Sequence, residues 1–124
     1  MKRITSVLLM VTFLSFTAFS TPRRIVLDNK GSIDNRSGFP LFFDCPETYY
    51  DDNSKAPNII IDGGGAVSYY DVEISSPVTN TVEISTQVNG TYDTFSISSL
   101  PTGTHVITIE SPSGNIFEGT FITY

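Results

Sequence analysis

The chain has 124 residues, of which 13 are acidic and 7 are basic, and its formal net charge at pH 7 is −6. This excess of negative charge repels phosphate backbones and anionic lipids, so we expect no nucleic-acid partner. The single cysteine, Cys45, excludes an internal disulfide, and the hydrophobic core alone must stabilise the domain.

The first predicted element is a secretory signal peptide. Basic residues at its start precede an apolar run over residues 4–19, and the small residues Ala18 and Ser20 place the cleavage site after Ser20. The run is short for the roughly 20 residues that a membrane helix needs, so no membrane span is expected after cleavage. The sequence predicts a cleaved segment over residues 1–20, a secreted or periplasmic protein, and a single domain over residues 21–124.

From residue 24 onward, short runs of β-branched and aromatic residues alternate with Gly, Pro, Asn and Ser. The clearest run is 70–75, where apolar and polar residues alternate as they do on a strand with one buried face. These features predict an all-β domain, an immunoglobulin/fibronectin-III-like antiparallel β-sandwich of about seven to eight strands. The predicted strands span residues 24–28, 39–44, 58–62, 67–74, 81–88, 92–98, 104–110 and 116–123.

Residues 45–57 are polar and irregular, and we expect a long loop there, with room for a short strand at 48–50. Several hard oxygen ligands fall in or beside this segment: Asp44, Glu47, Asp51, Asp52 and Asn53. Calcium takes six to eight such ligands, but the spacing lacks the central Gly and the late Glu of a calcium loop. We therefore interpret the segment as a solvated acidic loop, with opportunistic calcium binding as the alternative.

Glycine-containing turns separate several of the predicted strands. Residues 63–65, Gly-Gly-Gly, lack the Lys-Ser or Lys-Thr of a phosphate-binding loop and are interpreted as a flexible hairpin connection. Asn89 and Gly90 form the favoured pair for a type I′ hairpin turn, in which both central residues have positive φ. Residues 111–114, Ser-Pro-Ser-Gly, predict a hairpin between the last two strands.

Residues 100–103, Leu-Pro-Thr-Gly, resemble the Leu-Pro-any-Thr-Gly signal that sortases cut. One residue is missing between Pro and Thr, and neither an apolar span nor a basic tail follows. Pro101 presets φ for a turn, and Gly103 supplies the positive φ that ends it. We therefore predict a turn that leads into a core strand on which His105, Ile107 and Ile109 share one face.

The sequence contains no recognisable catalytic set. His105 is the only histidine, no Gly-x-Ser-x-Gly motif is present, and a zinc site would need further Cys or His ligands. We interpret His105 as a core-edge residue and Cys45 as a small buried hydrophobe. The expectation is a monomer that is not an enzyme and carries no cofactor or metal; a disulfide-linked dimer through Cys45 is the alternative.

Two pairs of adjacent aromatic residues, Tyr49-Tyr50 and Tyr69-Tyr70, lie on or beside predicted strands. Successive side chains leave opposite faces of a strand, so one tyrosine of each pair points outward and can stack on a sugar ring or anchor a protein contact. The candidate contact residues are Tyr49, Tyr50, Tyr69, Asp51 and Asp52. The plainer interpretation of the tyrosines is ordinary core and edge covering.

The C-terminal half resembles a known family. Residues 70–121 contain Y-x-V-x-I-S-S-P-V-T-N-x-V-x-I, then F-S-I-S-S-L-P-T-G-T-H-V-I-T-I-E, then G-N-I-F-E-G-T-F. This pattern resembles small secreted Bacteroidetes proteins built as single immunoglobulin-like β-sandwiches, a domain of unknown function. The resemblance implies the fold and an export route but no activity. His105 departs from the family, in which an aromatic residue, commonly Tyr, stands at this position.

The sequence thus favours an exported, non-catalytic binding or surface-interaction module whose partner is a protein or a glycan. Two alternatives remain at this stage. The last strands resemble the C-terminal tails that sort proteins through the type IX system, although those tails usually end in a Lys-rich strand and residues 111–124 contain no Lys or Arg. Exposed tyrosines would suit a carbohydrate-binding module.

Overall fold

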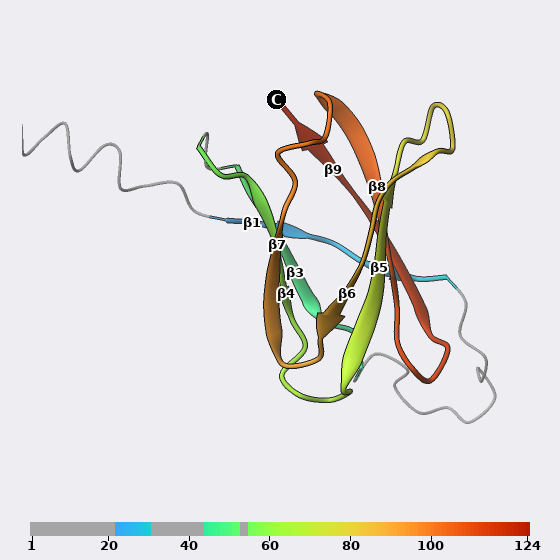
Figure 1. The fold of residues 1–124 in the computed structure, drawn as a ribbon. Coiled ribbons are helices and arrows are strands. Elements are labelled where there is room, and N and C mark those ends of the chain that lie inside the picture. The colour runs from blue at the N-terminus through green and yellow to red at the C-terminus, as the bar shows by residue number, and fades with distance from the viewer. Residues whose placement is uncertain (1–21, 31–43, 53–54) are drawn as a thin grey trace, which may run out of the picture.

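The computed structural model describes residues 22–30, 44–52 and 55–124, and this part of the chain forms nine β-strands in two facing antiparallel sheets (Figure 1). The predicted all-β antiparallel sandwich is therefore confirmed. One sheet has four strands in the order β1 (Arg23–Ile25), β3 (Glu47–Asp51), β4 (Asn58–Asp62) and β7 (Tyr92–Ser96). The other has five, in the order β2 (Asp28–Asn29), β9 (Ile116–Thr123), β8 (Gly103–Glu110), β5 (Tyr69–Ser75) and β6 (Val82–Asn89).

The core lies between the two sheets and is built by alternation along each strand. In β5, Tyr70, Val72 and Ile74 are buried while the polar residues between them are exposed, as the sequence predicts. Ile107 and Ile109 of β8 are fully buried on the same face. The buried apolar cluster draws on both sheets and comprises Ile25, Tyr50, Ile59, Ile61, Tyr70, Val72, Ile74, Val88, Ile97, Ile107, Ile109, Phe117 and Phe121.

The predicted first strand, 24–28, is wrong as a single element, because the chain changes sheets within it. β1 pairs with β3, whereas β2 pairs with β9 in the opposite sheet. Between them the chain crosses directly over Gly119, where an added Cβ would lie 2.6 Å from the carbonyl oxygen of Val26. Only glycine allows this close approach, so Gly119 sets the point at which the N-terminal segment leaves one sheet for the other.

A strand replaces the centre of the long loop expected over residues 45–57, and the short strand considered at 48–50 is confirmed within β3. β3 forms a five-residue ladder with β4 and pairs with β1 on its other side, so it lies inside the four-stranded sheet. Its sequence, Glu-Thr-Tyr-Tyr-Asp, alternates so that Thr48 and Tyr50 are buried. Of the strand predicted over 39–44, residues 39–43 lie outside the described residues, and Asp44 is in a turn.

The two hairpins predicted at residues 63–65 and at Asn89-Gly90 are instead connections between the sheets. β4 and β7 belong to one sheet, whereas β5 and β6 belong to the other. The connections bind each other, since the Gly63 and Gly64 amides both donate to the carbonyl of Thr91 at 3.1 Å. Gly90 does not have positive φ; an added Cβ there would lie 1.8 Å from the carbonyl oxygen of Val67. Close backbone packing, not a type I′ turn, requires this glycine.

Two other turns match the prediction. Residues 111–114 join β8 to β9 as a hairpin, in which the Gly114 amide donates to the Ser111 carbonyl at 2.9 Å and Gly114 has φ of 91°. Gly103 has φ of 137° at the start of β8. The Leu-Pro-Thr-Gly segment is therefore a turn that leads into a core strand.

Candidate functional site

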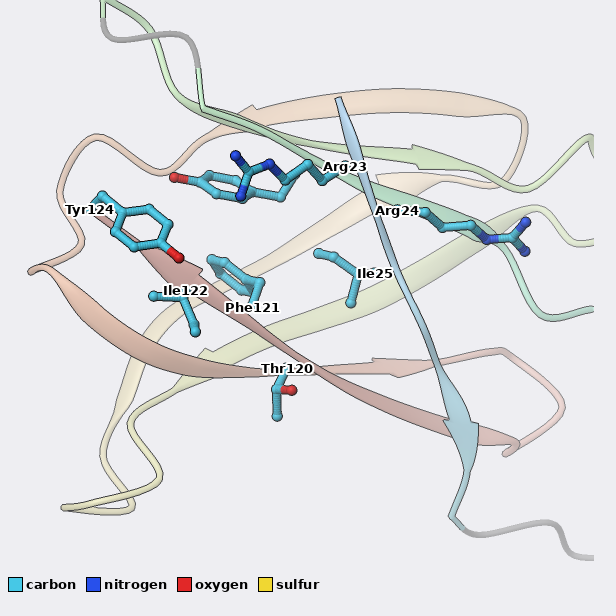
Figure 2. Close-up of a pocket in the computed structure, with 8 residues that line it drawn as sticks. Arg23, Arg24, Ile25, Thr120, Phe121, Ile122 and Tyr124 are labelled. Atoms are coloured by element: carbon cyan, nitrogen blue, oxygen red, sulfur yellow. The ribbon is translucent and has the colours of Figure 1, made fainter. Parts of the chain in front are cut away.

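Two adjoining hollows open at the end of the sandwich where β1 begins and β9 ends. One, of about 240 Å³, lies between β1 and β9 (Figure 2) and is lined by Arg23, Arg24, Ile25, Tyr50, Thr120, Phe121, Ile122 and Tyr124. The other, of about 300 Å³, is lined by Tyr50, Asp52, Pro57, Ile97, Ser98, Leu100, Thr102, Thr123 and Tyr124. Tyr50 and Tyr124 line both, so the two hollows form one surface feature, called here the tyrosine cleft.

Tyr50 forms the buried wall of the cleft. β3 places it opposite Arg23 of β1 and Ile59 of β4, on the inner face of the sheet, where only 6% of its surface is exposed. Its ring packs against Phe121 with centroids 5.4 Å apart and a tilt of 41°. Burial, and secondarily the Asp52 carboxylate, raise the pKa of Tyr50, so its hydroxyl stays neutral and can donate a hydrogen bond.

The exposed rim of the cleft is formed by Tyr124, Ile122 and Arg23. Tyr124 and Ile122 are 82% and 46% exposed, and both line the hollow between β1 and β9. Figure 2 shows Arg23 reaching over the hollow toward Tyr124, whereas Arg24 points away. Arg23 and Asp52 form an ion pair at 3.8 Å with both side chains well exposed, so this pair constrains the guanidinium only weakly.

The structure brings together only some of the predicted contact residues. Tyr50 and Asp52 line the cleft. Tyr49 lies on the opposite face of β3 from Tyr50 and donates its hydroxyl to Glu47 at 2.8 Å. Asp51 pairs with Asn58 at the end of the same strand, and Tyr69 starts β5 at the other end of the sandwich.

Most residues of the cleft were missed by sequence reasoning, among them Arg23, Ile122 and Tyr124. Arg23 reaches the site only because β1 borders the four-stranded sheet beside Tyr50. In the C-terminal segment, Ile122 falls on the polar side of the alternation that buries Phe117 and Phe121. Single exposed apolar residues are common on protein surfaces, so this position alone did not identify the cleft.

The oxygen ligands considered for calcium do not converge. Asp44 is buried, which corrects the prediction of a solvated loop: its Oδ2 accepts hydrogen bonds from Asn115 Nδ2 at 2.8 Å and Ser113 Oγ at 3.0 Å. Glu47 and Asp51 lie at opposite ends of β3. Within the described part of the chain no group of three or more His, Cys, Asp or Glu side chains could hold a metal ion. Asn53 lies outside the described residues.

His105 is a core-edge residue, as predicted, and is 2% exposed beside Phe121. Its Nε2 lies 2.8 Å from the carbonyl oxygen of Pro101, so Nε2 carries a proton and donates. Its Nδ1 lies 2.7 Å from Glu83 Oε1, a partner that the sequence did not indicate. The ring thus fastens the Leu-Pro-Thr-Gly turn and β6 to β8.

Cys45 is half-buried beside β1. Burial, and secondarily the Asp44 carboxylate, raise the pKa of its thiol. The protonated thiol is a poor nucleophile, so the environment of Cys45 suits a packing role.

No helix long and apolar enough to cross a membrane occurs among the residues that the structure describes, a range that does not include residues 1–21.

Comparisons with known proteins agree with this architecture. No family model matches the sequence, and no curated protein matches it. Among solved structures, the chain is similar to a DUF3244 family protein with an immunoglobulin-like beta-sandwich fold from Bacteroides vulgatus. The TM-score is 0.63 at 13% identity, and the match covers 84% of this chain and 100% of that one. The fold is an immunoglobulin-like β-sandwich. The neighbour fits the Bacteroidetes family that the C-terminal half resembles.

Proposed function

We propose that this protein is an exported, non-catalytic binding module that contacts a protein or a glycan through the tyrosine cleft. The observation that carries the proposal is the meeting of two hollows at Tyr50 and Tyr124, one tyrosine buried, the other exposed. Tyrosine and arginine are the residues most enriched at the energetic centres of interfaces. Their presence around one cleft favours recognition there.

The size of the cleft limits what it can hold. Pockets for drug-sized ligands and cofactors usually enclose about 300 to 1,000 Å³. The two hollows, of about 240 and 300 Å³, suit one or two side chains of a partner or a single sugar ring. Exposed Tyr124 could stack on such a ring, which is the form that a carbohydrate-binding function would take.

The non-catalytic part of the proposal is supported by the states of the two side chains best suited to chemistry. His105 is enclosed in the core with both ring nitrogens engaged. Cys45 has a raised pKa and is half-buried. Turnover of substrates in a broad panel of glycosides, esters and peptides, lost on substitution of either residue, would contradict this part.

A comparison of matched variants tests the site. The wild type, Tyr124→Ala and Tyr92→Ala would be assayed on a glycan array and by capture from native cell envelope and host mucus. Tyr92 is also exposed, at 55%, but lies at the other end of the sandwich, so it controls for the loss of a surface tyrosine. We expect Tyr124→Ala to lose the retained partner and Tyr92→Ala to keep it. Equal retention by both variants would contradict the site.

Export is tested separately, because residues 1–20 lie outside the described residues. We expect the mass of the protein purified from its native host to correspond to a chain that begins at Thr21. A mature protein that keeps residues 1–20 would contradict the signal-peptide prediction and leave the binding site untouched.

A further inference from the structure

Among the residues that the structure describes, the C-terminal half of β9 has a free edge. β9 pairs with β8 along its whole length, but on its other side β2 pairs only with Phe117 and Glu118. The Lys30 amide extends this contact by donating to the Ile116 carbonyl at 2.7 Å. No strand of the described chain pairs with residues 119–123 on that side, because the N-terminal segment crosses over Gly119 and joins the other sheet.

The ladder shows which backbone groups point out of this edge. In an antiparallel pair, residues whose amide and carbonyl both face one neighbour alternate with residues that face the other neighbour. The carbonyl of Ile116 faces β2, so the backbone groups of Thr120 and Ile122 face the same way. These two residues therefore present two N–H and two C=O groups toward the hollow between β1 and β9, which both of them line.

This edge lacks the features that block strand pairing at the borders formed by β1, β2 and β6. Proteins protect sheet borders with very short strands, prolines or charged residues, including charges that point inward. β1 and β2 are three and two residues long. β6 carries Glu83, which points inward to His105. Residues 119–124, Gly-Thr-Phe-Ile-Thr-Tyr, contain no charged side chain and no proline.

The hollow beside the free edge matches the side chains of an extended segment. On an added strand, alternate side chains would face the sandwich interior, where buried Ile25 and Phe121 form an apolar floor beside Tyr50. The other side chains would lie on the outer face beside exposed Ile122. At the open end stands Arg23, whose exposed guanidinium favours a carboxylate.

We propose that the free edge of β9 at Thr120 and Ile122 accepts an extended, proline-free segment of another protein as an added β-strand. The segment places an apolar side chain in the hollow and a carboxylate beside Arg23. Main-chain hydrogen bonds supply affinity and the hollow supplies selectivity, as in other β-strand additions. The inference rests on the proposed binding function and names its partner as a polypeptide.

Two proline variants provide a sharp test. Thr120→Pro removes an N–H that faces the free edge and leaves the ladder with β8 intact; edge strands tolerate such prolines. Ser85→Pro is the matched control on β6: Gly90 donates to Ser68, so by the same alternation the Ser85 N–H also faces away from its neighbour. Thermal unfolding of both variants checks that the fold is kept.

The probes are linear dodecapeptides selected from a random phage-displayed library on the immobilised wild-type protein. We expect Thr120→Pro to weaken binding of the selected peptides at least about tenfold and Ser85→Pro to leave it unchanged. Methylation of every second backbone amide of a selected peptide should abolish binding when the methylated amides are those that face β9. The same change on the other set of amides should leave binding unchanged. Equal binding by the two proline variants would overturn the proposal.

Other occupants give different results. Binding of a glycan that is lost in Tyr124→Ala and kept in Thr120→Pro would overturn strand addition and leave the proposed function standing. If neither Tyr124→Ala nor Thr120→Pro changes the binding of any partner, strand addition and the proposed function are both overturned. A wild-type dimer that Thr120→Pro converts to a monomer, measured by sedimentation, would assign the edge to a second copy of the chain and overturn the partner proposed here.

Discussion

Tyr70 shows how one buried side chain joins three separate parts of the chain. Its hydroxyl donates to the carbonyl of Asp44 at 2.7 Å, and its ring fills the space against Gly63, where an added Cβ would lie 2.7 Å away. Burial, and secondarily the Asp44 carboxylate, raise the pKa of Tyr70 to about 12 from its ordinary 10.0. The folded state therefore holds this proton more tightly than the unfolded chain does.

This difference predicts a loss of stability in alkali. Below pH 10 the phenol is protonated in both states; as pH rises from 10.0 to about 12, the unfolded chain releases the proton first. We expect the free energy of unfolding to fall over this range, and to fall less steeply in Tyr70→Phe. Urea denaturation at pH 9 to 12 measures it, with the exposed Tyr92→Phe as control. The same slope in Tyr70→Phe and wild type would contradict the assignment.

The contact between His105 and Glu83 predicts a coupled pair. Replacing His105 by Phe keeps a ring beside Phe121 but leaves the partly buried Glu83 carboxylate without its 2.7 Å partner. We expect His105→Phe to cost about 2 to 4 kcal/mol, and Glu83→Leu in the same chain to recover much of that loss. Chemical denaturation of both single variants and the double variant gives the coupling. Additive losses would contradict a direct pair.

At the scale of elements, substitutions in β8 and in the turn before it distinguish a core strand from a sorting signal. Ile107 and Ile109 are fully buried, so either change to Ala should cost about 2 to 5 kcal/mol. Gly103→Ala should also destabilise, because φ is 137°, whereas Thr102→Ala at an exposed position should change little. Chemical denaturation with cell fractionation tests the ranking. A normally folded Thr102→Ala protein trapped in the envelope would support the sorting signal instead.

The connections between the sheets give a second prediction at this scale. An alanine at Gly90 would meet the backbone of residues 67 and 68, which cannot move without shifting β5. At Gly64 the added Cβ meets nothing within 4 Å, and the cost of its φ of 65° is only about 1 kcal/mol. We expect Gly90→Ala to destabilise clearly more than Gly64→Ala in thermal unfolding. The reverse order would show that turn conformation, not close packing, dominates there.

At the scale of the whole molecule, the sequence predicts what depends on local periodicity and misses what depends on partner choice. The alternation in β5 and the turn at Gly103 are predicted correctly, because a strand face and a positive φ are local properties. The hairpin prediction for Asn89-Gly90 is wrong, because the same two residues suit both a hairpin and a connection between sheets. The pairing of β7 with β4 decides between them, and this pairing is set by the core.

The candidate site likewise divides into what local periodicity predicts and what depends on strand partners. The pair of tyrosines on β3 predicted that one would be exposed for contact, but the cleft is lined by Tyr50, the inward one, because the hollow lies between β1 and β9. Arg23 and Tyr124 come from the two ends of the described chain and meet only in the folded sandwich. No spacing in the sequence connects them.

Backbone amide shifts in the ¹⁵N-labelled protein, recorded while a selected peptide is titrated in, test binding at the tyrosine cleft most directly. We predict that the perturbed amides gather at Thr120, Ile122 and Tyr124 and at Arg23 across the hollow. The amide of Tyr69, at the other end of the sandwich, should not move. Perturbations centred on Tyr69, or on the outer face around Tyr49, would contradict the account.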